Sequence, residues 1–187
     1  MAPLWQLCKE GKLAKVREAL ARGEDVNCKD EGNWTAIMLA IKYNVGTKIV
    51  KLLLEQPFVD LNCTNKYGQT ALHIAAMMNS VEATKMLLAA TVNLNCTDKS
   101  GQTALHKAAR GDNVEIVKML LADPRLTTHN HKDNRGWTPV MSAAYYKNAG
   151  ALRELVAHPS VNLDTKDELR RILEEFAMCK WSRMFFM

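Results

Sequence analysis

The chain has 187 residues, of which 48% are hydrophobic and 24% are charged. This composition is typical of a globular protein and excludes an intrinsically disordered chain, and the length suits one domain. No apolar run approaches the roughly 18 residues of a membrane-spanning helix, so we expect no membrane span. The formal net charge of +5 is compatible with an acidic partner or with nucleic acid.

The first residues predict a terminal pair of helices. Apolar residues at helical spacing lead up to Gly11, and a second helical pattern begins at Leu13 and ends at Gly23. We assign residues 3–29 to this first unit. Its first helix carries polar side chains that an end unit needs, because no further unit stacks on it.

A nine-residue block then recurs along the chain. GQTALHIAA begins at Gly68, and GQTALHKAA begins at Gly101, 33 residues later. Weaker copies begin at Asn33 and Gly136, each 35 residues from its neighbouring copy. A period of this length predicts a stack of similar supersecondary units.

The recurring block resembles the ankyrin repeat, whose pattern runs D-x-x-G-x-T-P-L-H-x-A-A and continues into a second helix rich in V-K-L-L. The resemblance covers residues 4–166 and implies an all-α solenoid with short β-hairpin fingers, built from about five repeats and a C-terminal capping helix. It divides a single domain, residues 1–187, into repeats at 3–29, 30–64, 65–97, 98–132 and 133–166. Residues 167–187 are expected to form a capping half-repeat, because their apolar residues share one helical face.

Several recurring residue types predict structural roles within the repeats. The threonines expected to cap the helices are Thr35, Thr70, Thr103 and Thr138. His73 and His106 follow three residues later and are expected to tie adjacent turns together, since a metal-binding or catalytic role would need a partner in phase. Asn33 replaces glycine and tolerates a positive φ. The segment 45–47 holds one extra residue between two helices.

No catalytic or cofactor-binding motif appears in the sequence. The phosphate-binding patterns GxGxxG and GxxxxGK[ST] and the nucleophile motif GxSxG are absent. Asp30, Asp98 and Asp133 are expected to bond within their own turns. We therefore expect a protein that is not an enzyme and that has no cofactor, metal or small-molecule substrate.

Three cysteines, Cys28, Cys63 and Cys96, occupy the same place in successive repeats. Repeats stacked at about 10 Å would hold these thiols too far apart for a disulfide. Free thiols, with no secretory pattern in the first residues, predict a cytoplasmic protein, with the nucleus as the alternative. We expect a monomer.

The resemblance also indicates where a partner binds. Ankyrin-repeat proteins usually bind partners on the concave surface formed by hairpin tips and inner helices. The candidate partner-binding residues on that surface are Trp34, Lys42, Tyr43, Lys66, Tyr67, Met77, Met78, Lys99, Arg110, Arg135, Trp137, Tyr145 and Tyr146. Methionine adapts to varied apolar partners, and tyrosine and tryptophan are enriched in binding hot spots. Two structural alternatives stay open: Trp34 and Trp137 as hairpin packing, and the lysines as solvated tips.

These features favour a protein-interaction module, meaning a scaffold, adaptor or inhibitor that binds an acidic and apolar segment of a partner protein. One alternative is binding of nucleic acid or an anionic membrane through the ridge of lysines, which would weaken steeply with added salt. Another is that the chain is one recognition domain of a larger enzyme or receptor.

Overall fold

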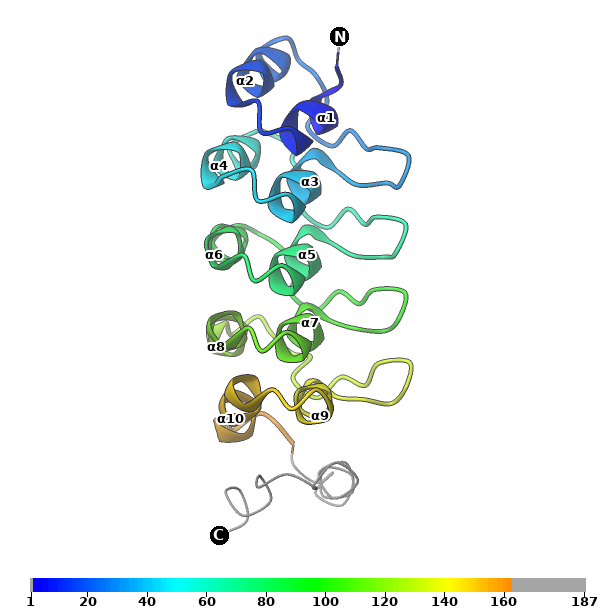
Figure 1. Ribbon diagram of the computed structural model, residues 1–187, viewed down its shortest axis with the longest axis vertical. Helices are drawn as coiled ribbons and strands as arrows, with labels where there is room; N and C mark the ends of the chain where they lie inside the picture. Colours follow the sequence, from blue (N-terminus) through cyan, green and yellow to red (C-terminus); the bar gives the residue numbers. More distant parts are fainter. Residues whose placement is uncertain (1, 163–187) are drawn as a thin grey trace.

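The computed structural model describes residues 2–162, which form ten helices arranged in two rows (Figure 1). The inner row consists of α1 (Leu4–Lys9), α3 (Ala36–Lys42), α5 (Ala71–Met77), α7 (Ala104–Arg110) and α9 (Pro139–Tyr145). The outer row consists of α2 (Leu13–Ala21), α4 (Thr47–Leu54), α6 (Val81–Ala89), α8 (Val114–Ala122) and α10 (Ala149–Ala157). The predicted all-α solenoid is confirmed. The expected capping half-repeat, residues 167–187, and the end of the fifth repeat lie outside the described residues.

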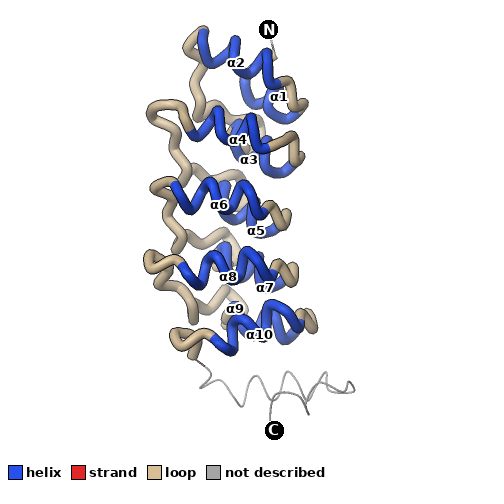
Figure 2. The backbone as a smooth tube through the Cα atoms, turned by 90° about the vertical axis from the view of Figure 1, so that its left-hand side faces the viewer, coloured by secondary structure: helices blue, strands red, loops and turns tan. Residues whose placement is uncertain are grey.

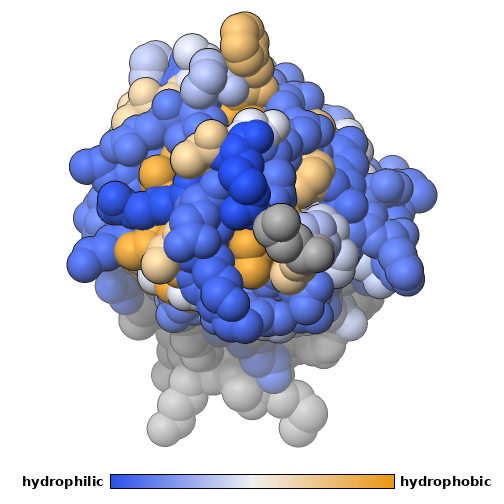
Figure 3. Space-filling model, turned by 90° about the horizontal axis from the view of Figure 1, so that it is seen from above, coloured by the Kyte–Doolittle hydropathy of each residue, from blue (hydrophilic) through white to orange (hydrophobic). Residues whose placement is uncertain are grey.

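Each inner helix pairs with the outer helix that follows it, and the pairs stack along the long axis of the molecule. The short turns that join the two helices of a pair lie along one edge of the stack, and the longer loops lie along the opposite edge (Figure 2). Seen from the N-terminal end, the surface is mainly hydrophilic (Figure 3). A polar end suits a unit that has no neighbour on that side.

The apolar core runs continuously between the two rows of helices. Leu53, Leu87, Leu120 and Leu155 occupy equivalent positions on successive outer helices, and all four are 0% exposed. Burying a leucine side chain contributes roughly 1.5–3 kcal/mol. Because each helix pair can bury this face only against its neighbours, stability accumulates interface by interface.

The fingers are closed by hydrogen-bonded turns. Within the described chain they do not contain the regular β-ladder of a β-hairpin. Among residues 2–162 the one β-bridge is the isolated antiparallel pair Lys29–Thr35. Instead, a side-chain oxygen closes each turn by accepting two backbone N–H groups at 2.8–3.0 Å, as expected for the three aspartates. The four acceptors are Asp30, Asn65, Asp98 and Asp133.

Neighbouring fingers are linked directly through their backbones. The Lys66 N–H donates to the Gly32 carbonyl at 2.9 Å, and the Lys99 N–H donates to the Tyr67 carbonyl at 3.0 Å. In the fourth repeat, glycine permits this close approach: Gly101 has a φ of 73°, and a Cβ there would lie 2.5 Å from the Asn134 side-chain oxygen. Asn33 holds the equivalent turn with a φ of 60°, which confirms the prediction for this residue.

Asparagine side chains join successive repeats along the longer loops. Each of three asparagines donates to a carbonyl of the next repeat and accepts a backbone N–H two residues further on. The sets are Asn27 with Phe58 and Asp60, Asn95 with Arg125 and Thr127, and Asn130 with Ser160 and Asn162. Asn62 contributes the accepting half of this arrangement, to the Asn93 N–H at 3.0 Å.

Buried histidines join the repeats on the inner side. His106 Nδ1 accepts the N–H of the capping Thr103 at 3.2 Å, and His106 Nε2 lies 2.9 Å from the Trp137 carbonyl of the next repeat. Nδ1 therefore carries no proton, and Nε2 donates, which fixes a neutral imidazole in one tautomer. His73 repeats this geometry with Thr70 and Gln102.

The predicted capping role of the four threonines is confirmed, since each is the N-cap of an inner helix. The predicted tie between turns is also confirmed for both histidines, and the second ring nitrogen extends it to the next repeat. In the fifth repeat, methionine replaces histidine, and the Met141 sulfur accepts the Thr138 N–H at 3.4 Å. In α5 and α7, the threonine–histidine pair therefore caps the helix and, through the histidine, connects it to the next repeat.

Replacing Asn95 with alanine should remove its bonds to the next repeat, including the 2.9 Å bond to the Arg125 carbonyl. We expect the free energy of unfolding to fall by about 1–2 kcal/mol, since a hydrogen bond contributes roughly 0.5–1.5 kcal/mol. Urea denaturation measures this change. Thr97→Ala, an exposed change in the same loop, is the control, and equal midpoints for both variants would contradict the assigned role.

Acid should weaken the fold through its buried histidines. Burial lowers the pKa of His73, and it lowers the pKa of His106 from 6.5 to about 4. The unfolded chain therefore binds protons more readily than the folded one, and stability is lost as the pH falls from about 6.5 towards 4. Asp98 and Asp133 have lowered pKa values, so their contributions are lost only in more acidic solution.

His106→Met tests this assignment, because Met141 already occupies the equivalent position in the fifth repeat. Between about pH 7 and about pH 4.5, the parent should lose about 2 kcal/mol more stability than the variant, at about 1.36 kcal/mol per pKa unit. Urea unfolding at both pH values measures the difference. Parallel pH profiles for the two proteins would show that His106 is not the titrating group.

Candidate functional site

Exposed large apolar side chains gather where the inner helices end. Among residues 2–162 they are Tyr43, Phe58, Tyr67, Met77, Met78, Tyr145 and Tyr146. Five of these, 36–46% exposed, are the last residue or the C-cap of an inner helix. Together with two cations at the same places they form the helix-end strip: Lys42, Tyr43, Met77, Met78, Arg110, Tyr145 and Tyr146.

The local backbone explains why these side chains are exposed. The residue after each C-cap takes a positive φ, with values of 48° at Asn44, 53° at Asn79 and Asp112, and 59° at Lys147. This left-handed residue ends the inner helix and reverses the chain into the outer helix. The positions just before the reversal lie at the edge of the stack, where no helix covers them.

The fingers supply a second row of candidate residues, the finger row, made of Lys66, Tyr67, Lys99, Arg135 and Trp137. Tyr67 is 52% exposed, the three cations are exposed and Trp137 is half-buried. The Trp137 ring lies 4.5 Å from the Tyr145 ring, and Tyr145 lies 5.1 Å from Tyr146. The structure therefore brings the two rows together in the fifth repeat.

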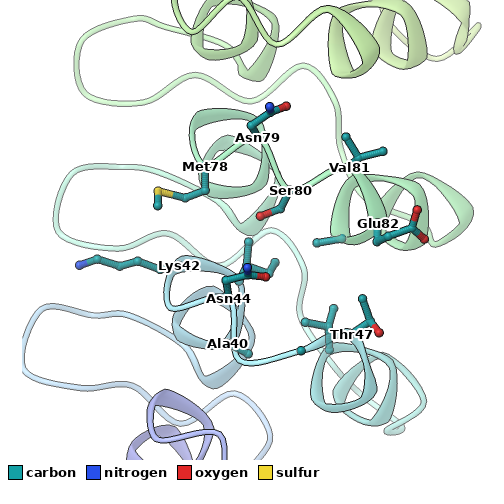
Figure 4. Close-up of a pocket in the computed structure, with 13 residues that line it drawn as sticks. Ala40, Lys42, Asn44, Thr47, Met78, Asn79, Ser80, Val81 and Glu82 are labelled. Atoms are coloured by element: carbon teal, nitrogen blue, oxygen red, sulfur yellow. The ribbon is translucent and has the colours of Figure 1, made fainter.

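Trp34 is placed differently from the other candidates. It is 8% exposed, and the Lys42 ammonium lies 4.1 Å from the centre of its ring. The tryptophan ring therefore lies beneath the Lys42 side chain of the helix-end strip, and little of the ring is exposed to solvent. Lys42 and Met78 extend towards the side of the finger loops (Figure 4).

Cations lie over the aromatic rings at both ends of the helix-end strip. Near the N-terminus, Lys9 and Lys42 lie 5.3 Å and 5.4 Å from the centre of the Tyr43 ring. Near the C-terminus, Arg110 lies 4.8 Å from the Tyr146 ring. The exposed pair Met77 and Met78 lies between these two groups. Sequence reasoning missed Lys9, although its position at the end of α1 matches that of Lys42 in α3.

The cations of this surface have no acidic partners within the described part of the chain. None of the recorded ion pairs involves Lys9, Lys42, Lys66, Lys99, Arg110 or Arg135. By contrast, lysines on three successive outer helices face glutamates, in the pairs Lys51–Glu55, Lys85–Glu82 and Lys118–Glu154. These six cations thus differ from the lysines of the outer helices, because their ammonium and guanidinium groups form no ion pair within residues 2–162.

Buried charges are used to hold neighbouring fingers. The Lys107 ammonium lies 2.6 Å from an Asp98 carboxylate oxygen, with side-chain exposures of 9% and 4%. Lys107 also donates to Gln102 at 2.7 Å, and Gln102 donates to Asp133 at 3.0 Å. Burial alone would raise the pKa of Asp98, but bonds from Lys107 and from backbone N–H groups lower it. The carboxylate stays ionised inside a satisfied network.

The cysteines among residues 2–162 are free thiols. Cys8, Cys28, Cys63 and Cys96 form no disulfide. Burial raises the pKa of each thiol, to about 12 for Cys8, which keeps them in the less nucleophilic thiol form. Within residues 2–162 there is no cluster of three or more potential metal ligands. No helix in that range is both long and apolar enough to cross a membrane.

Comparison with curated proteins finds related repeats in proteins of different kinds. The putative ankyrin repeat protein YahD of Escherichia coli (strain K12) is 38% identical over 88 residues, which are 44% of this chain and 43% of that protein. The human transient receptor potential cation channel subfamily A member 1 is 35% identical over 86 residues, 46% of this chain and 8% of the channel subunit. The chain matches less than half the length of each of these relatives.

The ankyrin repeat domain-containing protein SAT10 of Stachybotrys chartarum (strain CBS 109288 / IBT 7711) is 35% identical over 86 residues, which are 46% of this chain and 4% of that protein. The family model for ankyrin repeats in three copies matches residues 4–98 and 88–167. Ankyrin repeats are generally protein–protein interaction modules and are typically not enzymes. With its paired helices, threonine caps and stacked fingers, this chain belongs to the ankyrin-repeat family.

Proposed function

We propose that this protein is a non-enzymatic interaction module, acting as a scaffold, adaptor or inhibitor. Its partner is a protein segment with apolar anchors and acidic groups, laid across the helix-end strip and the finger row of repeats two to four. The observation that carries this proposal is the alignment of exposed methionine and tyrosine at equivalent helix ends, beside cations that have no acidic partner in the described chain.

The two kinds of residue would contribute differently to binding. Covering Met77 and Met78, which are 42% and 45% exposed, removes apolar surface from water at roughly 25 cal/mol per Å². The cations attract acidic groups, but charges at a hydrated rim mainly change the association rate and its salt dependence. Affinity should therefore depend chiefly on the apolar members of the helix-end strip.

The surroundings of the thiols support a cellular location. Cys28, Cys63 and Cys96 are half-buried and form no disulfide, which suits a reducing compartment. We propose that the module acts as a monomer in the cytoplasm, with the nucleus as the alternative.

A stability comparison separates the supporting residue from the contact residues. Trp34→Ala should cost about 3–5 kcal/mol, the usual range for removing a buried tryptophan. Met77→Ala with Met78→Ala should change the free energy of unfolding by about 0.5 kcal/mol or less, as is usual for surface positions. Chemical denaturation measures both. A large loss in the methionine variant would mean that this pair supports the fold and is not a free contact surface.

The binding test begins with a peptide-display selection on the immobilised protein, or with a partner identified by affinity purification from the source cells. At physiological salt, Met77→Ala with Met78→Ala should weaken binding by about tenfold or more, which corresponds to 1.4 kcal/mol. Lys66→Glu with Lys99→Glu should weaken it less at that salt concentration. Calorimetry measures the affinities, and circular dichroism verifies folding.

Lys85→Glu with Lys118→Glu, on the outer helices, is the matched control and should bind like the parent. The proposal is wrong if this outer pair abolishes binding while both inner pairs bind normally. Salt titration provides a separate check, because binding of nucleic acid through six cations would give a steep slope of about −0.9 per neutralised phosphate for duplex DNA. A shallow dependence is expected for a methionine-lined protein interface.

A further inference from the structure

A cavity of about 420 Å³ lies between the second and third repeats, at the turns that join inner to outer helices (Figure 4). One wall is formed by the end of α3 and the start of α4, and the other by the α5–α6 turn and the first residues of α6. Its lining combines apolar Ile41, Val50 and Val81 with polar Lys42 and Ser80. Lys42 and Met78 belong both to this cavity and to the helix-end strip.

The corresponding space in the next two interfaces receives an asparagine side chain from within the protein. Asn113, the N-cap of α8, donates to the Ala76 carbonyl at the end of α5 at 2.6 Å. Asn148, the N-cap of α10, donates to the Ala109 and Arg110 carbonyls at the end of α7 at 2.8 Å and 2.7 Å. Each carboxamide thus bonds carbonyls that have no partner within their own helix.

The interface between the second and third repeats lacks this asparagine. Ser80 is the N-cap of α6, and Figure 4 shows it between the two turns. Its hydroxyl makes no recorded hydrogen bond among residues 2–162. The carbonyl of Ile41, which is equivalent to those of Ala76 and Ala109, accepts the Asn44 N–H at 3.1 Å but receives no side-chain donor in the described chain.

The connection between α3 and α4 is also longer than its counterparts. It spans residues 43–46, whereas the equivalent connections span residues 78–80, 111–113 and 146–148. This confirms the extra residue expected from the sequence. Gly46, with a φ of 104°, lines the resulting space. The cavity therefore occurs at the interface that combines a longer turn with a missing carboxamide.

We infer that this cavity binds a primary carboxamide carried on a short apolar stem, supplied by an asparagine or glutamine side chain of the partner segment. The inference rests on the proposed function for the source of that side chain. The bound carboxamide donates to the Ile41 and Lys42 carbonyls at the end of α3, as Asn113 and Asn148 donate to the equivalent carbonyls in their own interfaces. Its stem packs against Val50 and Val81.

The charge of the lining favours a neutral donor. Lys42 and Glu82 both line the cavity, so a cationic group would approach Lys42 and an anionic group would approach Glu82. A carboxylate has the shape of a carboxamide but carries no hydrogen to donate to a carbonyl. A carboxamide is neutral and can donate hydrogen bonds. The chain itself places a carboxamide in the next two interfaces, through Asn113 and Asn148.

The experiment compares three probes of similar size that differ in their polar group: isobutyramide, isobutyrate and isobutylamine. Each is titrated into the full chain, and the amide NMR signals of Gly46, Ser80 and Val81 are followed. Isobutyramide should shift these signals saturably and bind at least about tenfold more tightly than the other two, which corresponds to 1.4 kcal/mol.

Ser80→Asn supplies the missing side chain from within the protein. This variant should melt at a higher temperature than the parent and should no longer respond to isobutyramide. Ser80→Ala is the matched control, and it should keep the response because it leaves the cavity open. Equal shifts from all three probes, or an unchanged isobutyramide response in a folded Ser80→Asn variant, would overturn the inference. The proposed function would survive that result, because the methionine and lysine variants test it separately.

Discussion

The structure depends on the inability of one helix pair to bury its own apolar surface. Two short helices joined by a turn leave apolar surface that only neighbouring pairs can cover, and in the stack Leu87 and Leu120 are both 0% exposed. Apolar contacts between repeats are non-directional and allow one repeat to shift relative to the next. Hydrogen bonds between repeats require a fixed donor–acceptor distance and angle. The histidine and asparagine bonds that cross to the next repeat therefore set the register in which the apolar faces meet.

The same register creates the candidate binding surface. Once each inner helix ends at the same height in its repeat, residues 33 to 35 positions apart in the sequence become neighbours along one edge. Tyr43, Met78 and Tyr146 are all C-caps. The repeat therefore places them in one row because their backbone positions are equivalent. The recurring residues hold the repeats together, whereas the exposed residues at the helix ends differ from one repeat to the next.

Departures from the repeat pattern have distinct physical consequences. At the position of Ile74, the fourth repeat has Lys107, and the buried Asp98 carboxylate on the finger of the same repeat compensates its charge at 2.6 Å. At the position of Asn113, the third repeat has Ser80, and no described side chain compensates for the lost amide. The first departure is neutralised within the protein, whereas the second leaves space and acceptors. The two differ because a charge cannot remain buried alone, while an open cavity can admit water or a ligand.

The sequence by itself determined the features that depend on local or periodic chemistry. The stacked repeats, the threonine caps, the turns closed by aspartate and the positive φ of Asn33 were all predictable, because each follows from one residue type at a fixed place in a short motif. The helix-end positions of the candidate residues followed from the same period. Their role in binding a partner stays a prediction.

The tertiary structure decided what depends on distances between repeats. The burial of Trp34 under Lys42, the approach of Lys9 to Tyr43, the Lys107–Asp98 pair and the cavity beside Ser80 all require two segments to be placed in space. The arrangement of the fingers was also not predictable from the sequence. Single backbone hydrogen bonds between repeats hold them side by side, and no regular β-ladder forms within a finger of the described chain. A repeat pattern specifies each unit, but contacts between non-equivalent side chains arise only when the units are stacked.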